Sequence, residues 1–232
     1  RRVPDATEIS SIAALIRSAE RPLVIAGGGV IYSDAQQTLT ELGRQTGLPI
    51  SETFAGKGAV TEDGPWSVFG IGLEGSPTTN RLAERADLIV HVGTRLTDFA
   101  TASQSIFQHP GVRFASINIV EHDAVKQGAT AVIADARLAL EALAAELGDY
   151  RAPEGWVADV VAAREAWLPV RAAALDPDAL FPRADHPELP VTDAILTQGQ
   201  LIGLLQEHAR AGDTIVAAAG GPPGDLQKVW DA

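Results

Sequence analysis

A short polar segment after an apolar run is the first candidate for binding an anion in this chain. The run DLIVHV (residues 87–92) ends at Gly93, Thr94 and Arg95. An arginine at such a place can hold a phosphate or a carboxylate through two parallel hydrogen bonds. A salt bridge to Asp98 explains this arginine equally well, because forked pairs with carboxylates are common. Both interpretations stay open at this point.

Two glycine-rich turns offer a second kind of anion site, in which backbone N–H groups take the place of side chains. Gly220 and Gly221 follow an apolar run and precede a helical pattern, so their amides can line an anion site near a helix start. Gly27, Gly28 and Gly29 follow another apolar run. Glycine there allows either a close approach of backbone to a ligand or a tight turn at the edge of a sheet.

Other patterns that resemble catalytic motifs are weaker. Residues 70–75 spell G-x-G-x-x-G, but the dinucleotide fingerprint needs a full strand before it, and only 66–69 is available. In the sequence GKG (56–58) glycine stands where a phosphate loop needs a hydroxyl for magnesium, so we reject that motif. The histidines show no metal-ligand spacing, and we interpret His91, inside an apolar run, as a hydrogen-bonded core or interface residue. No G-x-S-x-G nucleophile motif occurs.

The composition favours a small-molecule ligand over large charged partners. The net charge of −12 argues against nucleic acid or an anionic membrane, either of which needs a basic face. The absence of cysteine excludes disulfides, thiolate chemistry and zinc–thiolate sites, and it suits the cytoplasm, where we expect this protein. With 46% hydrophobic and 21% charged residues, the chain can bury a substantial core.

Apolar runs that alternate with amphipathic segments must position these candidate residues. The alternation predicts an α/β fold with a doubly wound, Rossmann-like parallel sheet flanked by helices. Ligands bind such sheets at the carboxyl ends of the strands, where the candidate residues lie. We treat the residues from 54 to 75 as a glycine-rich loop. The strands are predicted over 23–27, 49–53, 87–93, 113–119 and 130–134, and helices over 6–20, 34–46, 78–85 and 135–147.

The pattern changes after Gly148. Residues 149–190 combine a helical stretch with a proline-marked run, which indicates a linker packed along a surface. Residues 191–232 open a second α/β unit, with a helix from Thr197, a predicted strand over 214–220 and an amphipathic end. One strand and two helices cannot form a domain, and the sequence contains no methionine, so we expect a piece of a longer protein.

Seven segments, taken in order and spacing, resemble the family of thiamine-diphosphate-dependent enzymes. Within it the likeness is closest to the trihydroxycyclohexanedione hydrolases of inositol breakdown, which are similar to acetolactate synthase. The resemblance implies that 1–148 is a central domain, 149–190 a linker, and 191–232 the incomplete N-terminal part of a diphosphate-binding domain. The segments are IAGGGVIYS, ETFAGKGAV, GIGLEGS, ADLIVHVGTRLTDFAT, HDAVKQGA, VIADAR and AAGGPPGDLQKVW.

The resemblance implies that the whole protein is an enzyme that hydrolyses a carbon–carbon bond in a cyclic 1,2-dione, using thiamine diphosphate and Mg²⁺. Its activating glutamate and magnesium motif belong to parts of the family pattern that are not in this sequence. We therefore expect no catalytic residue and no metal ligand in this piece, and no activity from it alone. The resemblance also implies a homodimer or homotetramer for the whole protein.

Binding residues follow from the same resemblance. Gly220, Gly221 and Gln227 match the segment that reaches the diphosphate, although relatives often carry histidine at the glutamine position. Gly27 to Gly29, Gly72 to Gly75 and Gly93 to Arg95 match a nucleotide pocket of the central domain, which holds FAD in acetolactate synthase. Relatives that bind FAD carry an acid where Asn118 stands, so FAD is not expected here.

Two alternatives remain open. The first is a carboligase similar to acetolactate synthase, against which the segment HDAVKQGA and the long GGPPGDLQ turn favour the hydrolase. The second is a non-catalytic module that binds a nucleotide or serves as a scaffold. Analogy of fold alone does not exclude that second class.

Overall fold

Six parallel strands form one sheet in the computed structural model, in the order β3-β2-β1-β4-β5-β6. The structure describes residues 1–232 except 62, 180–195, 211, 219 and 232. From β1 the chain winds outward through β2 and β3, then returns to β4 and winds outward on the other side, so the predicted doubly wound fold is confirmed. The strands are β1 (Pro22–Ala26), β2 (Ile50–Glu52), β3 (Ser67–Gly70), β4 (Leu88–Val92), β5 (Arg113–Asn118) and β6 (Thr130–Ile133).

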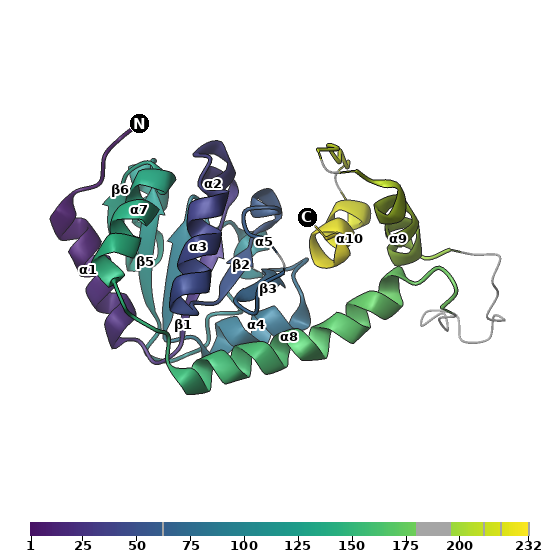
Figure 1. The fold of residues 1–232 in the computed structure, drawn as a ribbon, viewed down its shortest axis with the longest axis horizontal. Coiled ribbons are helices and arrows are strands. Elements are labelled where there is room, and N and C mark those ends of the chain that lie inside the picture. Colours follow the sequence, from purple (N-terminus) through teal and green to yellow (C-terminus); the bar gives the residue numbers. More distant parts are fainter. Residues whose placement is uncertain (62, 180–195, 211, 219, 232) are drawn as a thin grey trace.

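Helices cover both faces of this sheet and extend beyond it, as Figure 1 shows. Two helix ends follow from local sequence: Asp135 accepts a hydrogen bond from the N–H of Leu138, and Gly47 ends a helix with a φ of 71°. The helices are α1 (Ala6–Ser18), α2 (Gly28–Tyr32), α3 (Gln36–Thr46), α4 (Pro77–Arg85), α5 (Asp98–Thr101), α6 (Glu121–Ala124), α7 (Ala136–Leu147), α8 (Glu154–Leu175), α9 (Gln198–His208) and α10 (Gly221–Val229), with short 3-10 turns η1 (Phe54–Gly56) and η2 (Lys126–Gly128).

The core is divided by the sheet into two clusters. On one face, Val90 of β4 packs with residues of α1, α3 and α7. On the other face, its neighbour Ile89 packs with Leu82 of α4 and Trp156 of α8. The strands are therefore apolar on both sides, which explains why they read as continuous apolar runs in the sequence.

Strand β3 was missed, because its residues were assigned to a glycine-rich loop. It is a short edge strand that pairs with β2 alone, and its register shifts between the pairs Ile50–Ser67 and Glu52–Gly70. Phe69 lies at this shift with a φ of 68°. A strand that contains an extra residue loses the regular alternation by which strands are recognised.

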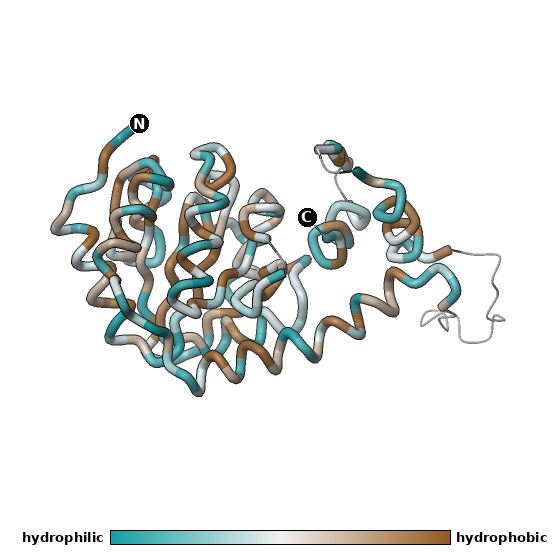
Figure 2. The backbone as a smooth tube through the Cα atoms, viewed as in Figure 1, coloured by the Kyte–Doolittle hydropathy of each residue, from teal (hydrophilic) through white to brown (hydrophobic). Residues whose placement is uncertain are grey.

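Helix α8 makes up most of the described part of the predicted linker. Its first turns contact the sheet, because the buried Trp156 donates a hydrogen bond from its indole nitrogen to the carbonyl of Pro22 in β1, at 2.8 Å. Its last turns lie beyond the sheet beside α9 and α10 (Figure 1). Figure 2 shows apolar residues recurring along the whole helix, as this double contact requires. The boundaries at 148 and 190 stay predictions, and 190 lies outside the described residues.

The C-terminal part contains the two predicted helices, α9 and α10, but the predicted strand over 214–220 was wrong in its described part. Residues 214–218 have no regular secondary structure, and Ala219 lies outside the described residues. Val216 is 90% exposed. A parallel strand needs a neighbour to accept and donate its backbone hydrogen bonds, and no described strand pairs with this segment.

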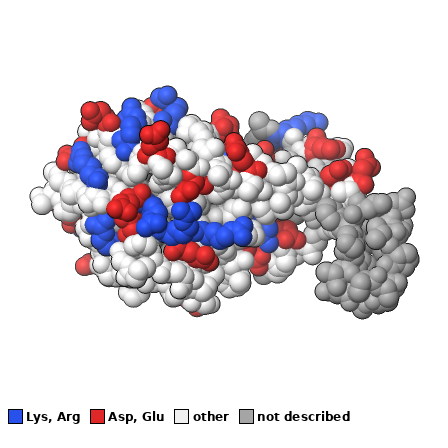
Figure 3. Space-filling view, turned by 90° about the horizontal axis from the view of Figure 1, so that it is seen from below, with Lys and Arg blue, Asp and Glu red and all other residues white. Residues whose placement is uncertain are grey.

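Charges of both signs share the surface. On the face in Figure 3, a band of Lys and Arg side chains crosses the molecule with acidic side chains on both sides. Arg85 of α4 and Asp159 of α8, for example, form an ion pair at 2.5 Å. Among the described helices, none is long and apolar enough to cross a membrane.

His91 is confirmed as a core residue. It lies on β4 with an exposed fraction of zero, and its Nδ1 is 3.3 Å from the hydroxyl of Ser116 on β5. Burial, together with the nearby positive charge of Lys126, lowers the pKa of His91 from 6.5 to about 4 against a smaller opposing effect of Asp123. The imidazole is therefore neutral at pH 7.

The buried histidine predicts a loss of stability in acid. Below pH 6.5 His91 binds a proton in the unfolded chain, whereas in the folded chain it stays unprotonated down to about pH 4. Between these limits we expect the free energy of unfolding to fall by about 3 kcal/mol through this residue. Urea unfolding at several pH values measures the slope, which should be shallower in His91→Gln and unchanged in the surface control His122→Gln. Equal slopes in all three proteins would contradict the prediction.

Candidate functional site

A cavity of about 690 Å³ opens at the carboxyl ends of the strands. It lies where β1 and β4 adjoin and the chain reverses its winding, which is the usual ligand site of such sheets. Most of the residues predicted from the sequence line it together. They are Gly28, Gly29, Gly93, Thr94, Arg95, Gly220 and Gln227, while Gly27 and Gly221 are not part of the lining.

The two glycine turns after β1 and β4 touch each other through their backbones. The N–H of Gly29 donates to the carbonyl of Gly93 at 2.9 Å, and a Cβ added to Gly29 would stand 2.6 Å from the Cα of Gly93. A Cβ added to Gly27 would meet Gly93 and Thr94 at 2.5 Å. These glycines are needed for close packing, and the amide of Gly29 is already in use within the protein.

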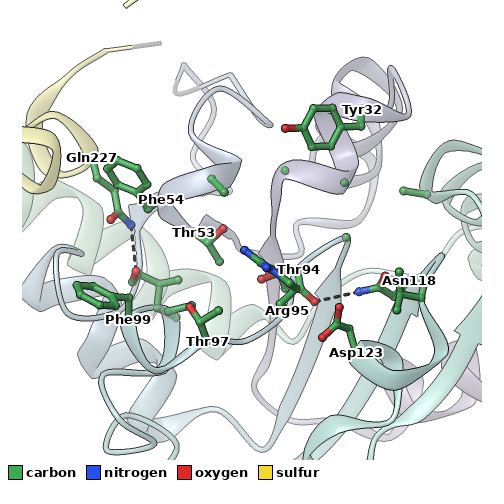
Figure 4. Close-up of a pocket in the computed structure, with 18 of the residues that line it drawn as sticks. Tyr32, Thr53, Phe54, Thr94, Arg95, Thr97, Phe99, Asn118, Asp123 and Gln227 are labelled. Atoms are coloured by element: carbon green, nitrogen blue, oxygen red, sulfur yellow. Dashed lines mark hydrogen bonds between the residues drawn. The ribbon is translucent and has the colours of Figure 1, made fainter. Parts of the chain in front are cut away.

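Arg95 is the one predicted anion-binding side chain in the cavity wall. It is exposed, and Figure 4 shows its guanidinium nitrogen atoms over the cavity between Thr53 and Thr94. Its backbone carbonyl accepts a hydrogen bond from Lys126 at 2.8 Å. In the part of the chain that the structure describes, the guanidinium makes no ion pair, so the salt bridge to Asp98 is not formed and the cation is available to a ligand.

Asn118, predicted as the position that departs from flavin-binding relatives, links two strand ends. Its side-chain nitrogen donates to the carbonyl of Thr94 at 3.0 Å (Figure 4), and its side-chain oxygen accepts from the N–H of Val120 at 3.0 Å. Both ends of the amide are used, and an acid could perform only one of these roles because a carboxylate donates no hydrogen bond.

Three aromatic side chains at the mouth were missed by sequence reasoning. Tyr32, Phe54 and Phe99 line the cavity with exposed fractions of 90%, 52% and 65%, and Figure 4 shows that they come from three separate segments. Each closely follows the end of an apolar run in the sequence, which was the available signal. Exposed aromatic rings at a cavity mouth offer stacking and apolar contact to a planar ligand.

The second wall of the cavity is the start of α10. Gly220 precedes the helix with a φ of 121°, a conformation that only glycine adopts without strain. The next helical residues include Pro222 and Pro223, which have no N–H group. The N–H groups of Gly220 and Gly221 are therefore the backbone donors left at this helix end.

Gln227 is buried at the other end of α10 and holds the helix to the sheet. Its side-chain nitrogen donates to the carbonyl of Ile71 at 3.0 Å (Figure 4) and to that of Glu52 at 3.4 Å. A Cβ on Gly70 would stand 3.0 Å from the Gln227 side chain. The amide nitrogen is thus committed to the protein.

The G-x-G-x-x-G segment follows β3, so the structure does supply a strand before it. Its glycines pack against the protein: Gly72, with a φ of 100°, abuts the carbonyl of Phe99, and Asn80 donates to and accepts from the Gly72 backbone at 2.9 and 3.0 Å. The turn is closed on itself. Nor do the described residues contain a group of three or more His, Cys, Asp or Glu arranged to hold a metal ion.

Comparison with known proteins identifies relatives for nearly the whole chain. Residues 9–143 match the family described as thiamine pyrophosphate enzyme, central domain. A 3D-(3,5/4)-trihydroxycyclohexane-1,2-dione hydrolase of Bacillus cereus is 36% identical over 242 residues, which is 99% of this chain and 37% of the relative. Proteins of the same name from Geobacillus thermodenitrificans and Clostridium perfringens are 36% and 33% identical, over 99% and 94% of this chain and 37% and 36% of their own lengths. The chain thus spans little more than a third of these relatives.

The double role of Asn118 predicts that aspartate will not replace it. Asn118→Asp removes the donor to Thr94 and sets a carboxylate against a carbonyl, so we expect a loss of about 1–3 kcal/mol in the free energy of unfolding. Chemical denaturation at pH 7.5 measures it. The control Asp123→Asn also changes one charge at the cavity wall, but it leaves the Thr94 contact intact and should cost less. If Asn118→Asp left the free energy of unfolding unchanged, the side-chain amide would not be what links the two strand ends.

Proposed function

This chain belongs to the family of thiamine pyrophosphate enzymes, and from that premise we propose that it is part of a hydrolase of trihydroxycyclohexane-1,2-dione. One observation carries the proposal: relatives of this name align with 94–99% of the chain at 33–36% identity, through both walls of the cavity. The reaction breaks a carbon–carbon bond of a cyclic 1,2-dione and consumes water. The chain contributes the central domain and the entry into the cofactor domain.

Thiamine diphosphate, when bound, supplies the carbanion chemistry that such a cleavage needs. The residues of this chain fit its anionic end in one place, the start of α10. Among the described residues the N–H groups of Gly220 and Gly221 meet no acceptor, and a Cβ added at Gly220 meets no atom within 4 Å, so a diphosphate has room to approach. Mg²⁺ is proposed to accompany the diphosphate, held by residues outside this sequence.

Gln227 is proposed to support the helix that carries these glycines and not to contact the charged diphosphate itself. Its amide is neutral, and its nitrogen already donates to Ile71 and Glu52. The carbonyl oxygen of the side chain remains available as an acceptor. Its contribution to cofactor binding is therefore to hold α10 against the carboxyl ends of β2 and β3.

The direct test is turnover by the whole purified protein. With thiamine diphosphate and Mg²⁺, the dione should be converted to a ring-opened acid, detected by mass spectrometry with one oxygen from ¹⁸O-labelled water. Pyruvate offered in the same assay should give no acetolactate. Acetolactate formation without dione cleavage would favour the carboligase. The 232-residue chain alone should be inactive in both assays.

The central cavity supports a second, compatible proposal: binding of a nucleotide-sized anion at Arg95. Support comes from the guanidinium of Arg95, which forms no ion pair with any described residue, from the volume of about 690 Å³ and from the aromatic side chains at the mouth. Gly27 to Gly29, Gly93 and Thr94 shape the floor of this pocket by their close packing. FAD is not the proposed occupant, because Asn118 stands where flavin-binding relatives carry an acid, and both ends of its amide already form hydrogen bonds within the protein. The purified whole protein is accordingly expected to lack the visible absorbance of a flavin.

The setting of this enzyme is proposed from composition and family. The acidic, cysteine-free chain suits a cytoplasmic protein that binds small molecules and neither nucleic acid nor membrane. A homodimer or homotetramer is proposed for the whole protein, and sedimentation of the whole protein tests it.

Gly221→Val should weaken the apparent affinity for thiamine diphosphate about tenfold or more in the whole protein, because a branched side chain screens the amide from the diphosphate. Its Cβ would meet only Gln198 at 3.5 Å, an ordinary contact, so the melting temperature should change little. Titration of activity against cofactor measures the affinity. Gly155→Val, at an open site on α8, is the matched control. A collapsed melting temperature with unchanged affinity per folded molecule would make Gly221 a structural residue.

Arg95→Met should lower the affinity for ADP, used as a probe, about tenfold, because it removes the cation of the cavity wall while keeping an unbranched apolar stem. Isothermal titration of the whole protein measures this, with the exposed Arg81→Met on α4 as control. Equal ADP affinity in the wild type and Arg95→Met would contradict an anion site at Arg95.

A further inference from the structure

Arg171 is a buried arginine on α8 that reaches the far end of α10. Its residue exposure is 8%, its Nε donates to the carbonyl of Val229 at 2.8 Å, and its terminal nitrogen lies 3.5 Å from the carboxylate of Asp231. Val229 is the last residue of α10. Carbonyls at a helix end lack partners within the helix and carry partial negative charge, which a guanidinium there neutralises.

The guanidinium is itself fixed by the aromatic ring of Phe69. Phe69 lies at the register shift of β3, and its ring packs with Trp167 of α8, Ile202 of α9 and Val229 in a buried cluster. The Arg171 guanidinium carbon lies 5.5 Å from the ring centroid. Stacking of this kind restricts the arginine and links the sheet edge to α10.

Arg164, which precedes Arg171 on α8, stacks on the same ring. Its guanidinium carbon lies 4.8 Å from the centroid, and it donates to the carbonyl of Ser67 at 2.9 Å. Both arginines therefore contact Phe69, and of the two it is Arg171 whose hydrogen bond to α10 is seen among the described residues. Comparing variants of the two arginines therefore distinguishes the effect of contact with the Phe69 ring from the effect of the hydrogen bond to α10.

The side of α10 that faces the sheet leaves little room for adjustment. Gln227 fills the space above Gly70, and the carboxylate of Glu74 lies against Gly224, where a Cβ would clash. With its last carbonyl held by Arg171, the helix is fixed along its length, and Gly220 stands at the cavity.

We propose that Arg171 is a positioning residue for the cofactor: it fixes the axis of α10 and thereby the place of the Gly220 and Gly221 amides. The inference rests on the proposed function, in which these amides hold the diphosphate. Arg171 does not touch the ligand. A helix of nine residues transmits a shift at Val229 to its first amides, because its internal hydrogen bonds keep it rigid. Hydrogen bonds to a fixed anion weaken steeply once the donor is misplaced.

The test is Arg171→Met in the whole protein, with Arg171→Lys as the conservative variant and Arg164→Met as the matched control. Activity is titrated against thiamine diphosphate at saturating Mg²⁺ and dione. We expect Arg171→Met to raise the apparent cofactor constant about tenfold, with kcat at saturating cofactor within about twofold of wild type. Arg171→Lys should recover part of the affinity, and Arg164→Met should match wild type. Hydrogen exchange of the α10 amides should be faster in Arg171→Met alone.

Three outcomes would overturn the inference. One is an unchanged cofactor constant in Arg171→Met while Gly221→Val raises it, which leaves the proposed function intact. The second is an equal rise in Arg164→Met, which assigns the effect to general packing of the Phe69 cluster. The third is an Arg171→Lys variant whose cofactor affinity and melting temperature fall as far as those of Arg171→Met. Arg171 would then only stabilise the fold. If Gly221→Val also left the apparent cofactor constant unchanged, the diphosphate site itself would be contradicted.

Discussion

The backbone contact between the turns after β1 and β4 is the constraint on which the cavity depends. The chain reverses its winding between these two strands, so their carboxyl ends must lie side by side. A side chain on Gly29 would push the turns apart, because its Cβ would overlap Gly93. The contact removes the amide of Gly29 from ligand binding and leaves Arg95 as the anion-binding side chain of this wall, to which Asp123 adds a carboxylate. Glycines here shape the pocket, and the arginine supplies its positive charge.

A single displaced residue in the edge strand joins the sheet to the helices beyond it. Phe69 leaves the regular register of β3, and its ring becomes the centre of a cluster built from α8, α9 and α10. Its φ of 68° is unusual for a residue with a side chain, and burial among apolar groups and two guanidinium groups offsets the cost. The second wall of the cavity is thus anchored to the first through this ring, and α8 is part of both.

The polar groups at the cavity divide into those that hold the protein together and those that remain for a ligand. Asn118 and Gln227 look like binding residues in the sequence, yet their side-chain nitrogens donate to backbone carbonyls. Of the residues predicted from the sequence, three keep donors without a partner among the described residues: Arg95, the amide of Gly220 in the cavity wall and the amide of Gly221 beside that wall. All of these are donors with positive character, and together they favour an anion at each end of the cavity. That division is what supports a diphosphate at α10 and a second anion at Arg95.

The sequence by itself determined the sheet, five of its strands and the edge at which the cavity opens. Strands buried on both faces must be continuous apolar runs, and turns that touch must be glycine, so both leave local marks that can be read without a structure. The tertiary structure alone decided the rest. It showed that Arg95 is not paired with Asp98, that β3 exists despite its broken alternation, and that residues 214–218 are not a strand. It also joined Gln227 to Ile71, 156 positions away. Contacts over such separations depend on how whole elements pack, and they leave no periodic pattern in the neighbouring sequence.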